Sequence, residues 1–484
     1  MNFKMIGRFV AKILAVEAVF MVPAALISLA GGETASMMSF TASIGIILAI
    51  AGLLALLSKG EDKTGFYAKE GLVCVALSWI AISLLGALPF VISGAIPHYV
   101  DALFEIVSGF TTTGASILSD VEALPRGQLY WRSFSHWLGG MGVLVFLLAV
   151  TPVGGRSTGF TMHLLRAESP GPNVGKLEPR MRETATILYI IYIALTVMDI
   201  VLLLIGGLPL FDAVCISFGT AGTGGFGVLN SSCASYSPFV QNVCTVFMLL
   251  FGVNFSCYYL ILLGQFKNVF KDEELRLFVG IVAACILLIF WDLRGFYGSL
   301  GETLRHAAFQ VASIVSTTGF ATADFDLWPS FSKGILLFLM VMGASAGSTG
   351  GGLKVGRALL LLKGLRRNIR SVMNPNKVQV VRINGETMSE RVLDNANAYL
   401  AAYVVIIIAS FVAISLDEFS VATNVSAVLA CFNNIGPGLD AVGPTCNYAG
   451  FSVFSKLVLI LDMLLGRLEI FPMLVLFSRG TWKQ

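Results

Sequence analysis

Four short strings of small and polar residues recur along the chain: FTTTGAS at Phe110–Ser116, AGTGGFG at Ala221–Gly227, VSTTGFA at Val315–Ala321 and FNNIGPG at Phe432–Gly438. Their alignment brings four glycines into register: Gly114, Gly225, Gly319 and Gly436. The glycines are spaced by 111, 94 and 117 residues, and Asp-Ala-Leu at 101–103 precedes the first string as Asp-Ala-Val at 212–214 precedes the second. This repetition predicts one structural unit that is present four times.

Each string lies between two long apolar runs and directly follows a shorter one. The shorter runs predict short helices at 102–110, 213–219, 308–315 and 425–432. A helix of about ten residues rises only about half of the roughly 30 Å hydrocarbon core of a membrane. These helices are therefore expected to be re-entrant rather than spanning.

The composition excludes a soluble globular protein. Apolar residues make up 56% of the 484 residues, charged residues make up 13%, and the mean hydropathy is +0.82. Two further apolar runs, 3–29 and 41–57, precede the first unit and predict a pair of leader helices. We expect an all-α polytopic membrane protein of ten spanning helices, in which four units of helix, pore helix, filter loop and helix surround a pseudo-fourfold pore.

The expected boundaries follow from these runs and from two hydrophilic stretches between them. They are a two-helix leader at 1–60, pore repeats at 61–155, 182–268, 269–366 and 391–484, and cytoplasmic linkers at 156–181 and 367–390.

The basic residues predict the topology. With ten crossings and a cytoplasmic N-terminus, the inside segments hold 25 of the 32 Lys and Arg residues. This bias predicts that both termini are cytoplasmic. The net charge of +3 is small and no basic patch is concentrated, which argues against nucleic acid as a partner.

Four re-entrant strings have a common chemical use. Irregular backbone at membrane depth is tolerated where it is buried in protein or lines a wet cavity. Glycine can adopt positive φ and direct carbonyls at an axis, while each short helix directs its negative end toward the same point. Such rings of carbonyls bind a dehydrated monovalent cation. Ordinary extracellular turns would explain one such string, but four in register favour a central pore.

The third repeat contains an unusual stretch within its second long helix. Residues Gly343–Gly352 (GASAGSTGGG) are all Gly, Ala, Ser or Thr. Five glycines in a helix interior would cost roughly 4–5 kcal/mol relative to alanine, so a break is expected. A small polar loop beneath the strings would shape or block the pore, whereas close helix packing by small residues is the alternative.

Arg467 lies near the centre of the last apolar run, Phe454–Phe477, where a charge costs roughly 2.5–3.5 kcal/mol. Asp462 and Glu469 are poorly placed to pair with it along one helix. We expect Arg467 to project into a wet interior, as an electrostatic barrier to cations or as a latch for another loop. An ion pair with Asp199 of another helix is the alternative.

Other ionisable residues allow more than one interpretation. Glu17 and Asp199 are intramembrane carboxylates that would either couple protons or make helix-packing hydrogen bonds. Nine further carboxylates are expected to form an acidic outer rim that concentrates cations: Glu105, Asp120, Glu122, Asp212, Asp324, Asp326, Asp417, Glu418 and Asp440.

Enzyme chemistry is not indicated. Gly222–Gly227 satisfies the dinucleotide-binding pattern G-x-G-x-x-G but lacks its flanking strand and acidic residue. The four histidines, His98, His136, His163 and His306, are expected near interfaces or loops, and no CxxC occurs. Cys233 and Cys446 fall in expected outer loops and are either free or paired in a disulfide.

These motifs together resemble the Trk/Ktr/HKT superfamily of potassium transporters, and the two-helix leader is similar to its bacterial TrkH-like branch. The resemblance covers essentially the whole chain, and FTTTGAS, VSTTGFA, ASAGSTGGGLKVGR (Ala344–Arg357) and LLGRLEIFP (Leu464–Pro472) are its most specific parts. It implies potassium uptake across the bacterial inner membrane through a gated, potassium-selective pore driven by the membrane potential. A proton- or sodium-coupled symporter, with Asp199 or Glu17 as coupling residue, is the alternative.

The resemblance also implies roles for individual residues. The expected potassium-binding selectivity filter comprises Thr112, Thr113, Gly114, Thr223, Gly224, Gly225, Thr317, Thr318, Gly319, Asn434, Ile435 and Gly436. The expected gate comprises Gly343, Ala344, Ser345, Ala346, Gly347, Ser348, Thr349, Gly350, Gly351 and Gly352, with Arg467 as the pore-facing arginine below the filter. Plant relatives with Ser at the first filter glycine pass sodium, so glycine at all four positions favours potassium. The fourth string departs from the others with Asn433-Asn434-Ile435.

Finally, the resemblance implies partners. Potassium is the transported ion, and no organic cofactor is expected in this chain. Membrane lipid surrounds it, and it is expected to form a homodimer with one pore per subunit. A cytoplasmic ring of nucleotide-binding regulatory subunits of the TrkA type is expected to control it, and the basic Lys363–Arg391 segment is a plausible contact.

Overall fold

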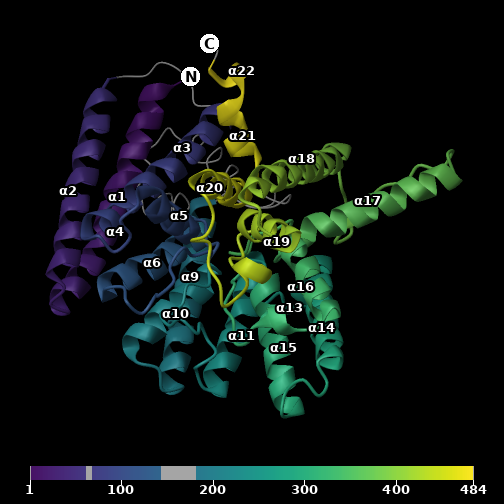
Figure 1. The fold of residues 1–484 in the computed structure, drawn as a ribbon. Coiled ribbons are helices and arrows are strands. Elements are labelled where there is room, and N and C mark those ends of the chain that lie inside the picture. Colours follow the sequence, from purple (N-terminus) through teal and green to yellow (C-terminus); the bar gives the residue numbers. More distant parts are fainter. Residues whose placement is uncertain (1, 61–67, 143–180, 483–484) are drawn as a thin grey trace.

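The computed structural model describes residues 2–60, 68–142 and 181–482, and within these ranges the chain is almost entirely helical (Figure 1). The strands of the described part are β1 (Arg382–Ile383) and β2 (Glu386–Thr387), which form a small antiparallel hairpin. The first expected linker, 156–181, lies outside the described residues except for its last residue. The hairpin lies within the second expected linker.

The leader is a pair of antiparallel helices, α1 (Phe3–Ala30) and α2 (Thr34–Leu57). The second begins seven residues earlier than the apolar run at 41–57 predicts, because serines continue it. Ser36, Ser39 and Ser43 are buried, and the Ser36 hydroxyl lies 2.9 Å from that of Ser28 on α1. Small hydroxyl residues thus form a helix-packing surface where the sequence indicated a loop.

The four repeats follow in order along the chain. The first contains α3 (Ala68–Gly86), α4 (Leu88–Ser93), α5 (Tyr99–Phe110) and α6 (Arg126–Gly140). The second contains α9 (Met181–Ile205), α10 (Leu210–Gly222), α11 (Pro238–Gly252) and α12 (Phe255–Leu262), and α13 (Phe266–Lys271) leads to the third. The third contains α14 (Glu273–Asp292), α15 (Leu300–Val315), α16 (Ser330–Met342) and α17 (Val355–Met373). The fourth contains α18 (Glu390–Ile414), α19 (Val421–Phe432), α20 (Val453–Arg467) and α21 (Phe471–Phe477), before the terminal α22 (Arg479–Trp482).

The short helices α5, α10, α15 and α19 are longer than expected. They hold 12, 13, 16 and 12 residues and begin three to eight residues before the predicted starts. In two of them a serine caps the additional first turn: the Ser299 hydroxyl of α15 accepts from Glu302 N at 3.2 Å, and the Ser420 hydroxyl of α19 accepts from Thr423 N at 3.1 Å. Such N-caps stabilise a first turn that the apolar pattern alone does not reveal.

Six helices of the described ranges are long and apolar enough to cross a membrane, and α11 and α12 form a further pair bent by 88°. The later helices of repeats two to four are interrupted: at the α11–α12 bend, at Gly343–Gly352 between α16 and α17, and at 468–470 between α20 and α21. The expected continuous run Phe454–Phe477 is therefore wrong, since α20 ends at Arg467 and both Glu469 and Ile470 have positive φ. The total of ten spanning helices stays a prediction.

The repeats close into a ring. Each short helix packs against the helix that follows it in its own repeat and against the corresponding helix of the preceding repeat. Thus α10 contacts α6, α15 contacts α11, α19 contacts α16, and α5 of the first repeat contacts α20 of the last. Because the fourth repeat returns to the first, the short helices surround a common axis.

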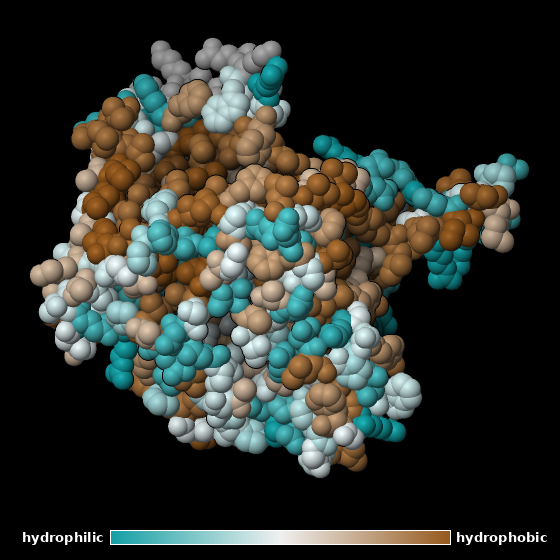
Figure 2. All heavy atoms as spheres, in the orientation of Figure 1, coloured by the Kyte–Doolittle hydropathy of each residue, from teal (hydrophilic) through white to brown (hydrophobic). Residues whose placement is uncertain are grey.

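The two termini lie together at one end of the molecule (Figure 1). The rings of Phe3 and Trp482 stack at 6.3 Å, and Lys69 Nζ donates to Gly480 O at 2.9 Å. Termini on the same side of a membrane require an even number of crossings, which is consistent with the predicted total of ten. The surface in Figure 2 is largely apolar toward that end and more polar toward the opposite end, as expected for a protein embedded in lipid.

Candidate functional site

The short helices end in the same way in all four repeats. One or two residues after each helix terminus the chain adopts the left-handed conformation: Thr112, Thr223, Thr317 and Asn434 have φ of 55, 55, 61 and 56°. In the first repeat Thr112 N donates to Gly109 O and Thr113 N to Ser108 O, at 3.0 and 2.8 Å, and the other three repeats make the corresponding bonds. This is the Schellman motif, which satisfies the last carbonyls of a helix and turns the chain sharply.

The four aligned glycines lie where neighbouring loops meet. Their φ values of 80, 76, 86 and 98° belong to the left-handed region. A Cβ on Gly114 would lie 2.1 Å from Gly224 O, one on Gly225 2.0 Å from Thr318 O, and one on Gly319 2.0 Å from Ile435 O. A Cβ on Gly436 would lie 2.8 Å from Thr113 O, which returns the series to the first loop. The four loops therefore form one closed ring, called here the glycine ring.

The glycine ring brings the expected filter residues together. Four carbonyls, those of Thr113, Gly224, Thr318 and Ile435, each lie against the glycine of the preceding loop, where the fourth loop precedes the first. The fourth loop, whose sequence differs from the others, also belongs to the ring, because Asn434 Nδ2 donates to Thr113 Oγ1 of the first loop at 3.0 Å. The described residues contain no group of three or more His, Cys, Asp or Glu side chains that could hold a metal ion.

A polar hollow of about 190 Å³ opens on one side of the glycine ring. All four glycines line it, together with residues that follow them in the loops, among them Ser116, Asn230, Thr445 and Tyr448. The short helices end on the other side, so their partial negative charges face the ring from there.

The segment Gly343–Gly352 lies against that other side. Gly351 N donates to Thr317 Oγ1 at 2.7 Å, and a Cβ on Gly351 would lie 2.3 Å from Asn433 O. The segment is buried and breaks the helix as expected, between Met342 of α16 and Val355 of α17. Packing of small residues alone does not describe it, because it is a folded loop rather than a helix face.

The bend between α11 and α12 accommodates the loop. Ser345 N donates to Gly252 O and Phe255 N donates to Gly347 O, both at 3.1 Å. On the remaining side, Ala346 N donates to Glu274 Oε1 at 2.5 Å, and Lys354 Nζ donates to Gly350 O. Residues from three repeats therefore contact this loop. The sequence predicted the loop but not these contacts.

Arg467 joins the loop to the first repeat. Its guanidinium donates to Thr349 O at 2.7 Å, to Thr112 Oγ1 at 3.2 Å, and to the carbonyls of Gly139 and Gly140. The ion pair with Asp199 is not formed, since Asp199 lies beside Ser217 on α10. Of the sequence alternatives, the geometry matches the latch, because one side chain spans the end of α6, the first loop and the Gly343–Gly352 loop.

Glu17 and Asp199 are both buried, on α1 and α9. Gly86 of α3 lies against Glu17. Neither carboxylate belongs to the residues that line the polar hollow.

One sequence expectation for the polar residues is wrong: Glu105 does not belong to the outer rim, because it is fully buried and paired with Arg132. His136 is buried within α6 and lies against the second loop at Gly224. Cys233 lies in the loop between α10 and α11 and is buried, whereas Cys446 is exposed, and both thiols are free. One rim carboxylate, Asp326, is paired with Lys333 at 3.8 Å, and Asp101, which was not assigned to the rim, pairs with Lys456 at 2.6 Å. The apolar pattern gave no signal for these ion pairs.

A ring of four re-entrant loops lined by carbonyls, within apolar helices, defines a membrane protein of the cation-transport class. The family model described as a cation transport protein matches residues 36–293 and 298–482. The chain belongs to this family, the TrkH family. It is not an enzyme.

Relatives match along the full length. The Trk system potassium uptake protein TrkH of Salmonella typhimurium and that of Escherichia coli K12 are each 36% identical, over 100% of both chains. The Trk system potassium uptake protein TrkI of Halomonas elongata is 30% identical over 97% of this chain and 95% of its own. The crystal structure of the potassium transporter TrkH from Vibrio parahaemolyticus covers 100% of both chains with a TM-score of 0.89 and 32% identity.

Proposed function

We propose that this protein takes up potassium across the cell membrane through a potassium-selective pore that passes along the axis of the glycine ring. The cyclic contact of each filter glycine with the carbonyl of the next loop is the observation that carries the proposal. The names of the full-length relatives, potassium uptake proteins, support potassium as the cargo.

The ring offers the chemistry that a dehydrated potassium ion needs. Carbonyl oxygens of the twelve filter residues replace the hydration shell, and the C-terminal ends of four short helices add negative potential. The transported ion is thus a passing ligand of the backbone rather than a resident metal.

The Gly343–Gly352 loop and Arg467 form the gate of the proposed pore. The loop lies under the third and fourth filter loops, where Thr317 and Asn433 contact it. Arg467 adds a positive charge beside Thr112 of the first filter loop. A cation on the axis would meet both an obstacle and an electrostatic barrier, so conduction requires the loop and the arginine to move together.

Passive permeation is the mechanism that the site supports. The membrane potential supplies about 2.3 kcal/mol per charge per 100 mV, enough to concentrate potassium inside. Coupled symport would need a titratable group on the ion path, and Glu17 and Asp199 do not line the hollow above the ring.

The assembly is proposed as a homodimer in the bacterial inner membrane, with lipid around it and both termini cytoplasmic. The far end of α17 extends away from the body of the protein (Figure 1) and exposes Val372 and Met373, with 84% and 73% of their surfaces accessible. A second copy of the chain would cover this apolar end. Arg366, Arg367 and Arg370 on the same helix provide a contact for an acidic surface of a TrkA-type regulatory subunit.

Flux into proteoliposomes of the purified chain tests the proposal. Potassium, sodium and choline would be compared with and without a proton gradient at a fixed membrane potential. We expect potassium-selective flux that follows the potential alone. Flux that requires a proton or sodium gradient, or equal flux of sodium and potassium, would contradict it.

A further inference from the structure

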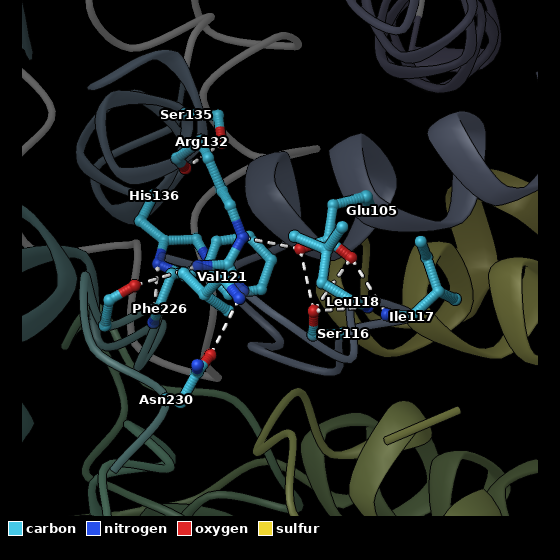
Figure 3. Close-up of polar contacts among 11 residues, drawn as sticks. Glu105, Ser116, Ile117, Leu118, Val121, Arg132, Ser135, His136, Phe226 and Asn230 are labelled. Carbon is cyan, nitrogen blue, oxygen red and sulfur yellow. Dashed lines mark hydrogen bonds and ion pairs between the residues drawn. The ribbon is translucent and has the colours of Figure 1, made fainter. Parts of the chain in front are cut away.

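The buried guanidinium of Arg132 lies between the first two filter loops. Arg132 of α6 is only 3% exposed, and its Nε lies 2.5 Å from Oε1 of Glu105, which is fully buried on α5 (Figure 3). Glu105 in turn accepts from Ser116 Oγ at 3.0 Å and from Ile117 N, also at 3.0 Å. The pair therefore holds the chain just beyond Gly114 of the first loop.

The same guanidinium holds the second loop. Arg132 Nη1 donates to Gly227 O at 3.0 Å, and its central carbon lies 3.5 Å from the centre of the Phe226 ring. His136, one turn further along α6, stacks on Phe226 at 4.1 Å. Its ring occupies the space that a Cβ on Gly224 would fill, at 2.3 Å, which explains why the second string has glycine where the first and third have threonine.

No ion pair joins the loops at the other junctions in the described part of the chain. The third and fourth loops are joined by Thr445 Oγ1, which donates to Asp324 Oδ2 at 3.4 Å. The second and third loops are joined by Cys233 N to Ala321 O, at 2.9 Å, and the fourth and first by Tyr448 N to Ser116 O, at 2.8 Å. At the position of Glu105, nine residues before the filter glycine, the other repeats have Ile216, Gln310 and Ala427. The buried ion pair thus breaks the fourfold symmetry of the ring at one junction.

We propose that Arg132, held by Glu105 and Phe226, is a positioning residue that determines the potassium selectivity of the ring by fixing the separation of the first and second loops. The inference rests on the potassium-selective pore proposed above. Arg132 lines the polar hollow, where Glu105 and the carbonyl of Gly227 hold its guanidinium. Its charge is compensated by Glu105, so the pair orders two loops without repelling a cation on the axis.

The choice of arginine has a geometric reason. A planar guanidinium donates along its edge to Glu105 and Gly227 while its face rests on Phe226, and the ammonium of lysine cannot do all three. Arg132→Lys therefore keeps the charge and removes the alignment. Arg132→Gln removes both and leaves Glu105 as an unpaired buried anion beside the pore.

Lys456 offers a matched control. It is 6% exposed and pairs with Asp101 at 2.6 Å, so it also joins α5 to a neighbouring helix by an ion pair, although Asp101 is only partly buried. Neither residue lines the polar hollow or contacts a filter loop in the described structure. Lys456→Gln is expected to lower thermal stability and to leave the selectivity unchanged.

The test measures the ratio of potassium to sodium flux in proteoliposomes for the unmodified protein, Arg132→Lys, Arg132→Gln and Lys456→Gln. We expect the ratio of potassium to sodium flux to fall by about threefold or more in both Arg132 variants and to stay constant in the control. Selectivity is the difference between the binding free energies of potassium and sodium at the glycine ring, and that difference depends on the spacing of the loops. A selective unmodified protein with equally selective Arg132 variants would overturn the inference. An unselective unmodified protein would instead overturn the proposed function.

A second readout applies to variants that fold but do not conduct. The melting temperature of the detergent-solubilised protein would be measured in potassium and in sodium chloride, and their difference reports selective binding. We expect this difference to shrink in Arg132→Lys and to persist in Lys456→Gln. An equal effect in both variants would mean that Arg132 contributes only to folding.

Discussion

At the residue scale, each filter glycine meets two separate demands. Its φ lies in the left-handed region, and the space of its Cβ is occupied by a carbonyl of the next loop. A side chain would therefore strain its own backbone and displace a carbonyl that we propose as a ligand of potassium. The first demand could be anticipated from the sequence, but the second arises only when the ring closes.

The four glycines are not equally sensitive to substitution. At Gly114, Gly225 and Gly319 a Cβ would approach a carbonyl to 2.0–2.1 Å, but at Gly436 the distance is 2.8 Å. We expect Gly114→Ser and Gly319→Ser to lower the potassium-to-sodium permeability ratio by about tenfold, equivalent to about 1.4 kcal/mol, and Gly436→Ser to lower it less. Reversal potentials under bi-ionic conditions would measure it. An unchanged ratio in the first two variants would remove these glycines from the filter.

Arg467 makes contacts that only a guanidinium can make together. We expect Arg467→Ala to raise basal flux, since both the charge and the link between Thr112 and Thr349 are lost. Arg467→Lys should raise flux less, because the charge remains while the link is weakened. Rubidium uptake by proteoliposomes checks the order of the two variants. Reduced flux in Arg467→Ala would contradict the barrier.

Two carboxylates of the expected outer rim, Asp120 and Asp440, are stabilised in their charged form by hydrogen bonds. Hydrogen bonds from Ser420 and Thr423 lower the pKa of Asp440 below its ordinary value of 3.8, and the Asn230 side chain does the same for the pKa of Asp120. A lowered pKa favours the charged form, and this contribution is lost only as the pH falls below the ordinary value. We expect the apparent KM for external potassium to stay constant between about pH 8 and pH 5. A severalfold increase across that window would indicate a different titrating group.

At the scale of elements, the sequence predicted those features that local residue preferences determine. It did not predict those that depend on contacts with distant segments. The glycines of 343–352 predicted the helix break, and the short apolar runs predicted re-entrant helices. The 88° bend between α11 and α12 had only Asn254 as a local signal, whose Oδ1 accepts from Ser256 N at 2.9 Å. That bend depends on contacts with the Gly343–Gly352 loop, which no local pattern encodes. The left-handed threonines were missed because this conformation normally favours glycine.

The Gly343–Gly352 loop can be tested with a pair of glycine variants. Gly351→Ala places a methyl group 2.3 Å from Asn433 O, so we expect the loop to shift and basal flux to rise. Gly334→Ala is the control, since no atom lies within 4 Å of its Cβ and alanine stabilises a helix interior by roughly 0.5–1 kcal/mol. Its flux should equal that of the unmodified protein. Equal flux in both variants would show that the loop does not limit conduction.

At the scale of the whole molecule, the sequence predicted the class, the number of repeats and their cyclic arrangement. It placed Glu105 wrongly in an outer rim and did not reveal that Arg132 and His136 contact the second loop, because a pattern of similar repeats contains no signal for the junction where the repeats differ. These residues pack between repeats one and two, and burial between repeats is a property of the closed ring rather than of any segment.

The placement of the outer face can be checked with the native cysteines. Cys446 is exposed, whereas the other seven, all in the described ranges, are buried. A membrane-impermeant maleimide added to spheroplasts should label the protein, and Cys446→Ser should abolish the labelling. Labelling that requires disruption of the membrane would place this loop, and with it the polar hollow, on the inner side.

The central claim is that potassium passes through the glycine ring, and locating the ion tests it most directly. Thallium replaces potassium and scatters anomalously, so crystals grown in thallium would reveal bound ions by diffraction. We predict anomalous density on the axis, surrounded by the carbonyls of Thr113, Gly224, Thr318 and Ile435, which disappears when thallium is exchanged for sodium. Density elsewhere, with none at the ring, would contradict the account.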